Sequence, residues 1–187
     1  MSPTQRIDKE AVLAAALALI NEEGAGRLTM RALANRLGVQ AASLYHHVTG
    51  RDELLRMVAD KVAQAAIEQI PPTTDWRAYA RGLANGLRSV LQEHPGAAQV
   101  VAVQEVSPTV FAPVAPVVDD LFLPALDVDR EAVLHLLQGL YVLVVGLVAA
   151  ESGSVPQPPV APTSYYEAWY EVTVETFLDG IACRVQR

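Results

Sequence analysis

The sequence predicts an all-α protein in which an N-terminal three-helix domain with a helix-turn-helix precedes a larger helical domain. Apolar residues recur at the helical period of 3.6, and capping residues, Gly or Pro separate the segments that show this period. No segment has the two-residue alternation that is typical of a half-buried strand. We therefore expect domains at residues 1–50 and 51–187, with a helix over residues 51–69 connecting them.

The first predicted helix covers residues 7–23 and ends at Gly24. Its apolar positions follow helical spacing, so that one face is expected to be buried. The inward residues of this face are Val12, Ala16, Leu19 and Ile20.

Residues 28–55 hold the most informative pattern of the chain. Thr29 can cap a short helix whose apolar residues fall at i, i+3, i+4 and i+7, and Gly38 can end it in a left-handed conformation. A second helix over residues 40–47 then turns Leu44 inward. Two short helices joined by a tight turn form a helix-turn-helix, whose second helix can lie in the major groove of DNA. The apolar residues of the first of these helices are Met30, Leu33, Ala34 and Leu37.

The larger domain contains further helices separated by breakers. The connecting helix has an acidic first turn, which the helix dipole favours, and Pro71 and Pro72 follow it. Asp75 caps a helix over residues 76–93. Shorter helices are expected over residues 97–103 and 114–126, while the prolines of residues 107–116 leave that segment unassigned.

A long apolar helix is expected to begin after Asp127 or Asp129 and to run to Ala150. Residues 132–150 are numerous enough to span a bilayer. They include His135 and Gln138, however, and an acidic residue stands on each side. We therefore expect a buried interface helix and no membrane partner.

The C-terminal part combines a proline-rich segment with a last helix. Residues 152–163 predict an exposed, mobile loop, and residues 164–184 predict a helix. Four acidic residues spaced by four on this helix predict a solvated stripe. They are Glu167, Glu171, Glu175 and Asp179.

The charge of the chain is divided unevenly. Residues 1–61 hold eight Lys and Arg against seven Asp and Glu, whereas the net charge of the whole chain is −7. An acidic body would repel DNA, so any DNA contact is expected in the N-terminal third. The single cysteine, Cys183, excludes an intramolecular disulfide, suits a reducing cytoplasm and is expected to be a buried small residue.

Enzymatic chemistry has no recognisable signature in this sequence. A Gly-rich phosphate loop, a nucleophile elbow and metal-ligand spacing are all missing, and the four histidines are scattered. We therefore expect a protein that is not an enzyme and has no cofactor and no metal site.

Over residues 7–60 the chain resembles the DNA-binding domain of the TetR family of bacterial transcriptional regulators. Beyond this region it resembles the family only in size, helical character and layout. The residues that carry the resemblance are Leu28, Thr29, Arg31, Leu33, Ala34, Leu37, Gly38, Val39, Leu44, Tyr45, His47, Val48, Arg51, Asp52, Glu53, Leu54 and Leu55.

The resemblance implies a DNA site on the helix-turn-helix. Thr29, Tyr45 and His47 would bind phosphate, and Arg31 would reach phosphate or a guanine edge. Thr29 has the alternative role of a helix cap, and Tyr45 that of half-buried packing. The start of the second helix would face the groove, with His46 at the groove edge and Arg51 on the DNA backbone. The residues at that start are Gln40, Ala41, Ala42 and Ser43.

The resemblance also implies a homodimer that reads a palindromic operator. Small residues on the long apolar helix would let a partner helix approach closely, and the last helix would complete a four-helix interface. Alternatively, the glycines fit packing within one chain. The candidate interface residues are Gly139, Val142, Gly146, Ala149, Tyr170 and Phe177.

A cavity for a small-molecule effector is the third implication of the resemblance. Few charges are available inside the body, which favours a hydrophobic or aromatic effector, and the body lacks the histidine and threonine pattern by which tetracycline repressors hold a magnesium chelate. The candidate lining residues are Trp76, Tyr79, Leu83, Leu87, Val100, Phe111, Leu137, Tyr141, Tyr166 and Trp169.

These observations together predict a cytoplasmic, dimeric transcriptional regulator, for which we favour a repressor that its effector releases from DNA. The alternative is a helical protein–protein interaction module that binds no DNA. Arg31, Gln40 and Arg51 favour the regulator, because an interaction module has no need of basic and amide side chains along one exposed edge of a helix-turn-helix.

Overall fold

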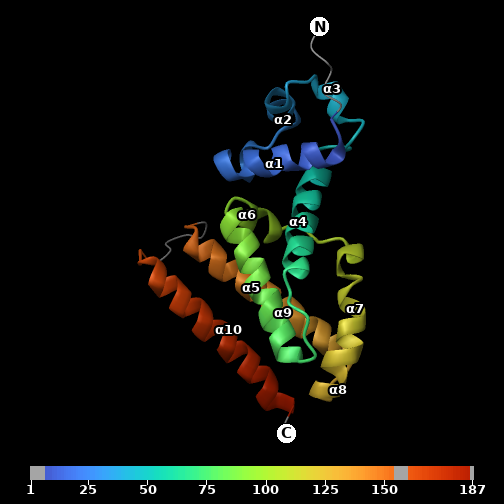
Figure 1. Cartoon of the computed structure of the whole chain (residues 1–187). Coiled ribbons are helices and arrows are strands. Elements are labelled where there is room, and N and C mark those ends of the chain that lie inside the picture. Colours follow the sequence, from blue (N-terminus) through green and yellow to red (C-terminus); the bar gives the residue numbers. More distant parts are fainter. Residues whose placement is uncertain (1–6, 154–159, 186–187) are drawn as a thin grey trace.

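The computed structural model describes residues 7–153 and 160–185, and within these ranges every regular element is a helix. Figure 1 shows a small head formed by the first helices and a longer helical body below it. The α-helices are α1 Lys9–Glu23, α2 Met30–Leu37, α3 Ala41–Leu44, α4 Arg51–Glu68, α5 Trp76–Glu93, α6 Ala97–Val101, α7 Val114–Val117, α8 Leu123–Leu126, α9 Arg130–Glu151 and α10 Thr163–Val185. The short additional turns are η1 Ala25–Arg27, η2 Pro108–Phe111 and the π-helical η3 Val118–Phe122.

Several helix boundaries agree with the capping residues in the sequence. The side chains of Asp8, Asp75 and Asp129 each accept a hydrogen bond from a first-turn amide of α1, α5 and α9. Of the two aspartates predicted for α9, the cap is therefore Asp129, while Asp127 adopts a left-handed conformation with φ 45°. The prediction for residues 114–126 is confirmed as a nearly continuous helix formed by α7, η3 and α8.

The head and the body share one hydrophobic core. The predicted inward residues of α1 are all buried, as are Leu33 and Leu44 of the helix-turn-helix. Helix α4 carries the core from the head into the body, because it contacts α1 of the head as well as α5 and α6. Through this arrangement α4 joins the two parts both covalently and by packing.

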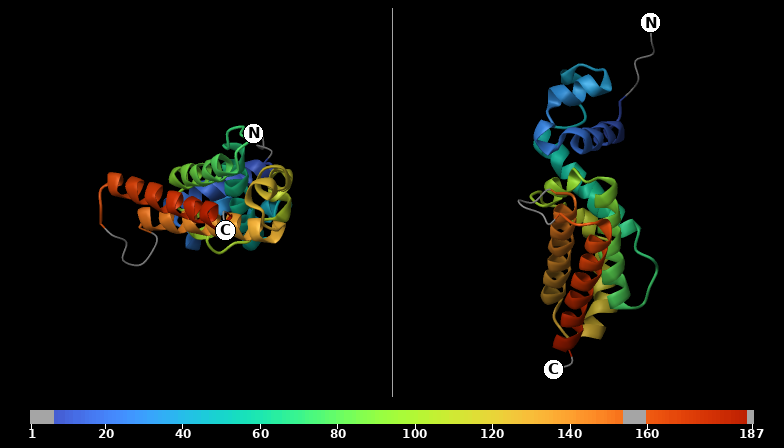
Figure 2. Two further views of the ribbon diagram at one scale, coloured as in Figure 1. Left: turned by 90° about the horizontal axis from the view of Figure 1, so that it is seen from below. Right: turned by 90° about the vertical axis from the view of Figure 1, so that its left-hand side faces the viewer.

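The body consists of α5 to α10, with α5 packed between α4 and α9 (Figure 1). Figure 2 shows α9 and α10 side by side on one face of the body. A side chain at Gly86 would come within 2.5 Å of the Ala66 carbonyl oxygen, so glycine there permits the close approach of α5 to α4. Of the predicted loop over residues 152–163, residues 154–159 lie outside the described ranges.

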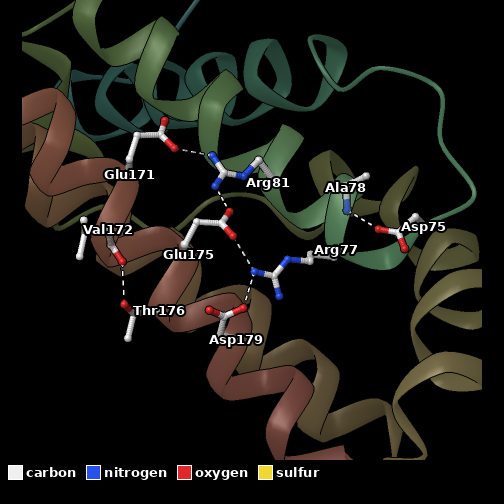
Figure 3. Close-up of polar contacts among 9 residues, drawn as sticks. All are labelled: Asp75, Arg77, Ala78, Arg81, Glu171, Val172, Glu175, Thr176 and Asp179. Atoms are coloured by element: carbon white, nitrogen blue, oxygen red, sulfur yellow. Dashed lines mark hydrogen bonds and ion pairs between the residues drawn. The ribbon is translucent and has the colours of Figure 1, made fainter.

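The predicted acidic stripe of α10 is not simply solvated, because three of its four carboxylates pair with α5 (Figure 3). Arg77 donates to Glu175 and Asp179, each at 2.6 Å. Arg81 donates to Glu171 at 2.8 Å and also pairs with Glu175. These ion pairs attach α10 to α5, and they depend on a tertiary contact that the spacing of the acids does not reveal.

Helices α9 and α10 both carry exposed side chains. The prediction that Cys183 is buried was wrong, since its side chain is exposed on α10. Within the described residues, α9 is the one helix long and apolar enough to cross a membrane, with a mean hydropathy of 2.1 over the window concerned. Only 33% of that window is buried within the chain, so an apolar surface of α9 remains uncovered.

Candidate nucleic-acid interface

The first helix of the motif, α2, is fixed at both ends as its sequence predicts. The hydroxyl of Thr29 accepts a hydrogen bond from the amide of Ala32 at 3.1 Å. Gly38 takes a left-handed conformation with φ 68°, and the amide of Val39 donates to the Ala34 carbonyl at 3.0 Å. The capping role of Thr29 is therefore present, and its hydroxyl proton is still available to a second partner.

The second helix of the motif is shorter than predicted. The sequence predicts residues 40–47, whereas α3 ends at Leu44 and a turn follows it. In this turn the amides of His47 and Val48 both donate to the Leu44 carbonyl, at 2.9 and 3.0 Å. The turn places Val48 in the core, and this long-range packing limits α3 to little more than one turn.

The outer face of α3 is formed by a subset of the predicted contact residues. Gln40, Ala42, Tyr45 and His46 are exposed, with Tyr45 exposed to 56%. In contrast, the other three predicted residues of this segment are half-buried, and one of them packs against the core. These three are Ala41, Ser43 and His47.

The cations of the head differ in whether they have partners within the chain. Arg31 of α2 is exposed and makes no hydrogen bond or ion pair with any residue that the structure describes. Arg36, one turn further along α2, donates twice to Glu22 of α1, both bonds being 2.6 Å. These bonds hold the pKa of Glu22 below its ordinary value. Arg31 is therefore the free cation of the motif's first helix, as far as the described residues show.

Arg51, predicted to contact the DNA backbone, forms hydrogen bonds within the head. Its Nε donates to the Leu28 carbonyl at 2.9 Å, and its Nη2 donates to the Ala25 carbonyl at 3.0 Å. Two residues further on, Glu53 accepts hydrogen bonds from the Thr49 amide at 2.6 Å and the Thr49 hydroxyl at 2.8 Å. These bonds, with a smaller contribution from Lys9, hold the pKa of Glu53 below its ordinary value.

Known proteins resemble the chain in both sequence and fold. Residues 12–58 match the family described as "Bacterial regulatory proteins, tetR family". The tetracycline repressor protein class C of Escherichia coli is 34% identical over 99 residues, which are 52% of this chain and 45% of that protein. The matched region spans less than half of the first curated relatives, namely 41%, 45% and 46% of their lengths.

Solved structures extend the similarity to almost the whole chain. A single-residue variant of TetR from Acinetobacter baumannii AYE in complex with minocycline matches with a TM-score of 0.82 and 27% identity, over 96% of this chain and 99% of that chain. The N-terminal region of the chain therefore matches the TetR family, and the chain as a whole has the fold of a solved TetR protein. BioQ with its double-stranded DNA operator matches with a TM-score of 0.67 and 25% identity, over 95% of this chain and 99% of that chain.

Only some of the predicted effector residues of this chain come together. Trp76 and Tyr79 of α5 both contact Phe122, with ring centroids 6.1 and 5.9 Å apart. The hydroxyl of Tyr141 on α9 donates to the carbonyl of Val101 at 3.4 Å. Val101 directly follows Val100, another of the predicted lining residues. Burial raises the pKa of Tyr141 to about 12.

Tyr166 and Trp169 lie in a different place, near the start of α10. With Tyr165 they form an aromatic cluster whose ring centroids are 5.5 to 6.3 Å apart. Because Arg77 near the start of α5 pairs with Asp179, the start of α5 faces the end of α10. The aromatic cluster therefore lies roughly 20 Å along α10 from the level of Trp76.

The remaining predicted effector residues differ in burial. Leu87 and Val100 are buried, Leu83 and Leu137 are half-buried, and Phe111 is exposed. Two hollows among the described residues have volumes of about 110 and 180 Å³, and none of the ten predicted residues lines either one. Ligand pockets usually measure about 300–1,000 Å³. In this conformation Trp76 and Tyr79 pack against the Phe122 ring, and the predicted lining residues form neither hollow.

The predicted interface residues also divide into two groups. Val142 and Gly146 are exposed on α9, and nothing lies within 4 Å of a side-chain position at Gly146. Gly139, however, faces the Phe177 ring, which would lie 3.4 Å from a Cβ at this position, so this pair packs α9 against α10 within one chain. Ala149 is buried as well.

Tyr170 lies inside the chain and not on its outer face. Its hydroxyl donates to Asn85 at 2.9 Å, and the Arg88 guanidinium lies over its ring at 4.5 Å. Burial raises the pKa of Tyr170 to about 12. The outer face of α10 instead presents Val172, which is exposed to 66% and was not among the residues predicted for the interface.

Proposed function

We propose that this chain is a cytoplasmic transcriptional repressor of the TetR family that binds a palindromic operator as a homodimer and is released by a small, largely hydrophobic effector. The observation that carries the proposal is that Arg31 on α2 is exposed and has no partner among the described residues, while α3 of the same helix-turn-helix also presents exposed residues. Every other part of the proposal depends on whether this surface binds duplex DNA.

The exposed side chains of α3 suit base reading by a small number of contacts. Gln40 can form a bidentate pair with adenine, and Ala42 can contact a thymine methyl group. Tyr45 and His46 extend the surface toward the phosphates on the groove edge, while Arg31 supplies the positive charge. Since direct contacts are few, DNA shape would contribute to specificity.

The dimer is supported by the uncovered apolar surface of α9 and α10. Gly139 contacts Phe177 between these antiparallel helices, which puts Val142 and Val172 at about the same level of the body. Both valines are more than 60% exposed. A second copy of the chain would bury this surface about a two-fold axis, and two motifs would then read the two halves of a palindrome.

The effector is supported by the apolar body and by a neighbour that binds a small molecule. The A. baumannii protein forms a complex with minocycline. In this chain, His94 is bonded to Asn21 of α1 and His135 is exposed, so neither histidine of the body faces the predicted lining residues. We therefore infer an effector without a metal chelate. Its binding would require the packed body to open around Tyr141 and Trp76.

Release from DNA would follow from the position of α4 between head and body. An effector that binds the open body more tightly than the closed one shifts the equilibrium toward a conformation in which the two motifs no longer match successive major grooves. Coupling of this kind amounts to about 1–3 kcal/mol in known systems.

Binding of a random-sequence DNA duplex at low salt tests the proposal without knowledge of the operator. Arg31→Ala should weaken binding by about tenfold, because a free cation at the phosphates is lost. Arg36→Ala also removes one positive charge from α2, but this side chain is already paired with Glu22, so its effect should be small. Equal binding by both variants and the wild type would reject the DNA surface and favour a protein–protein interaction module.

A further inference from the structure

The first turn of α4 holds the chain where it enters the helix-turn-helix. The guanidinium of Arg51 donates to the carbonyls of Ala25 and Leu28, at 3.0 and 2.9 Å. Leu28 is completely buried and directly precedes Thr29, the residue that caps α2. The two hydrogen bonds therefore fix the segment from which α2 begins.

The same turn holds the chain where it leaves the helix-turn-helix. Glu53 accepts from both the amide and the hydroxyl of Thr49, at 2.6 and 2.8 Å. Thr49 directly follows Val48, whose side chain is buried in the core behind α3. Lys9 of α1 also donates to Glu53, at 3.3 Å.

Two oppositely charged residues, two positions apart, thus contact both ends of the motif from one turn of helix. We propose that Arg51 and Glu53 are positioning residues, which make the helix-turn-helix move with α4 as one body, and that Arg51 does not bind phosphate. The inference rests on the proposed DNA-binding function and specifies how α4 sets the orientation of the recognition surface.

The geometry of Arg51 favours this role over a phosphate contact. Its planar guanidinium already spans two carbonyl acceptors, an arrangement that a phosphate contact would have to break or share. Arg31 is available for phosphate without any such loss, since the described part of the chain gives it no partner. The charge that DNA requires is therefore supplied by α2, and the first turn of α4 supplies the geometry.

The dependence of operator affinity on salt concentration distinguishes positioning from phosphate contact. Each phosphate contact contributes about −0.9 to the slope of log K against log salt, so losing one contact per protomer changes a dimer's slope by about 1.8. Arg51→Ala should weaken binding by about tenfold and leave the slope unchanged. Arg51→Lys keeps the charge but not the planar fork, and it should recover little of the affinity.

Arg56→Gln serves as the charge control for these variants, because it removes one exposed cation from the next turn of α4. A reduced slope for Arg51→Ala together with recovery by Arg51→Lys would show a phosphate contact and overturn the proposal. Unchanged affinity and slope for Arg51→Ala would overturn it as well.

Glu53 provides a second test with the opposite charge change. Removing an acid close to DNA should strengthen binding if only charge matters, whereas loss of the Thr49 contact should weaken it. We expect Glu53→Ala to weaken operator binding several-fold and Asp52→Ala, its exposed neighbour, to leave it equal or stronger. Stronger binding by both would contradict the positioning role.

Thermal unfolding of each variant shows whether it is folded at the temperature of the binding assay. If a variant at residue 51 does not fold, the comparison of Glu53→Ala with Asp52→Ala decides. A folded wild-type protein that binds no duplex would instead reject the proposed function itself.

Discussion

Gly96, at the corner between α5 and α6, lies against the carbonyl group of Ile20 in the last turn of α1. A Cβ on Gly96 would come within 2.8 Å of the Ile20 carbonyl carbon and 3.0 Å of the Asn21 Cα. Beside this contact, the side chains of Asn21 and His94 form a 2.9 Å hydrogen bond. The head is therefore attached to the body at this corner as well as through α4.

Gly96→Ala should force α1 away from the body. Inserting one methyl group against backbone atoms typically costs about 1–3 kcal/mol, so the free energy of unfolding should fall by that amount unless the head moves. If the head moves to make room for the methyl group, operator affinity should change, although Gly96 is remote from the DNA surface. Thermal unfolding and operator titration together measure both effects.

Gly26→Ala is the matched control for this substitution. Gly26 lies in the head, has no atoms within 4 Å of its Cβ position and does not adopt a left-handed conformation. If the Gly96 and Gly26 variants behave alike, the corner between head and body has no role in setting the head's position.

The ion pairs between α5 and α10 should make the attachment of α10 sensitive to salt. Glu175 pairs with both Arg77 and Arg81, and the side chains are partly exposed (Figure 3). Glu175→Gln should lower the free energy of unfolding by about 0.5–1 kcal/mol at low salt and by less at high salt. Urea unfolding at two salt concentrations measures the difference.

Glu167→Gln makes the equivalent change on α10 at an exposed position for which the described residues provide no ion pair. An equal effect of Glu167→Gln and Glu175→Gln, or a loss that salt does not alter, would show that the ion pairs contribute nothing specific.

The exposed valine of α9 tests the proposed dimer. Val142→Glu places a charge in the centre of the surface that a second copy would cover. The variant dimer should therefore dissociate at a higher protein concentration than the wild-type dimer. Val103→Glu, at a valine that is exposed to 77% outside α9 and α10, is the control. Sedimentation velocity over a range of concentrations measures both; a Val142→Glu dimer as tight as the wild type would move the interface elsewhere.

The buried tyrosines predict a loss of stability in alkaline solution. Burial raises the pKa of Tyr141 and of Tyr170 to about 12, while an unfolded chain ionises near 10. The unfolded state therefore loses these protons first as the pH rises, and stability that is complete below pH 10 should decline between pH 10 and 12. The phenolate absorbance of the folded protein should include a component that appears only above pH 10. This component should be smaller in the Tyr141→Phe variant. Titration of every tyrosine near pH 10 in the folded protein would contradict this.

Local sequence signals were sufficient for most helices and for the motif. The apolar spacing of α2, the left-handed Gly38 and the aspartate caps act within one turn of the chain, and the structure agrees with each of them. The end of α3 was predicted three residues too late, because the burial of Val48 depends on the rest of the head.

The partners of charged side chains were the part that the sequence could not supply. The spacing of Glu171, Glu175 and Asp179 is compatible with a solvated face, and only the approach of α5 turns them into ion-pair partners. Similarly, the position of Arg51 after a helix-turn-helix suggested phosphate, whereas its acceptors lie on a segment more than twenty residues earlier in the chain.

Selection of bound sequences from a random duplex library, with the purified wild-type chain at moderate salt, tests the central claim most directly. We expect enrichment of one inverted repeat, with its half-sites separated by a whole number of helical turns and two protomers bound to each site. The Arg31→Ala variant should enrich this inverted repeat poorly. A folded, dimeric protein that enriches no sequence would contradict the claim that this surface reads an operator.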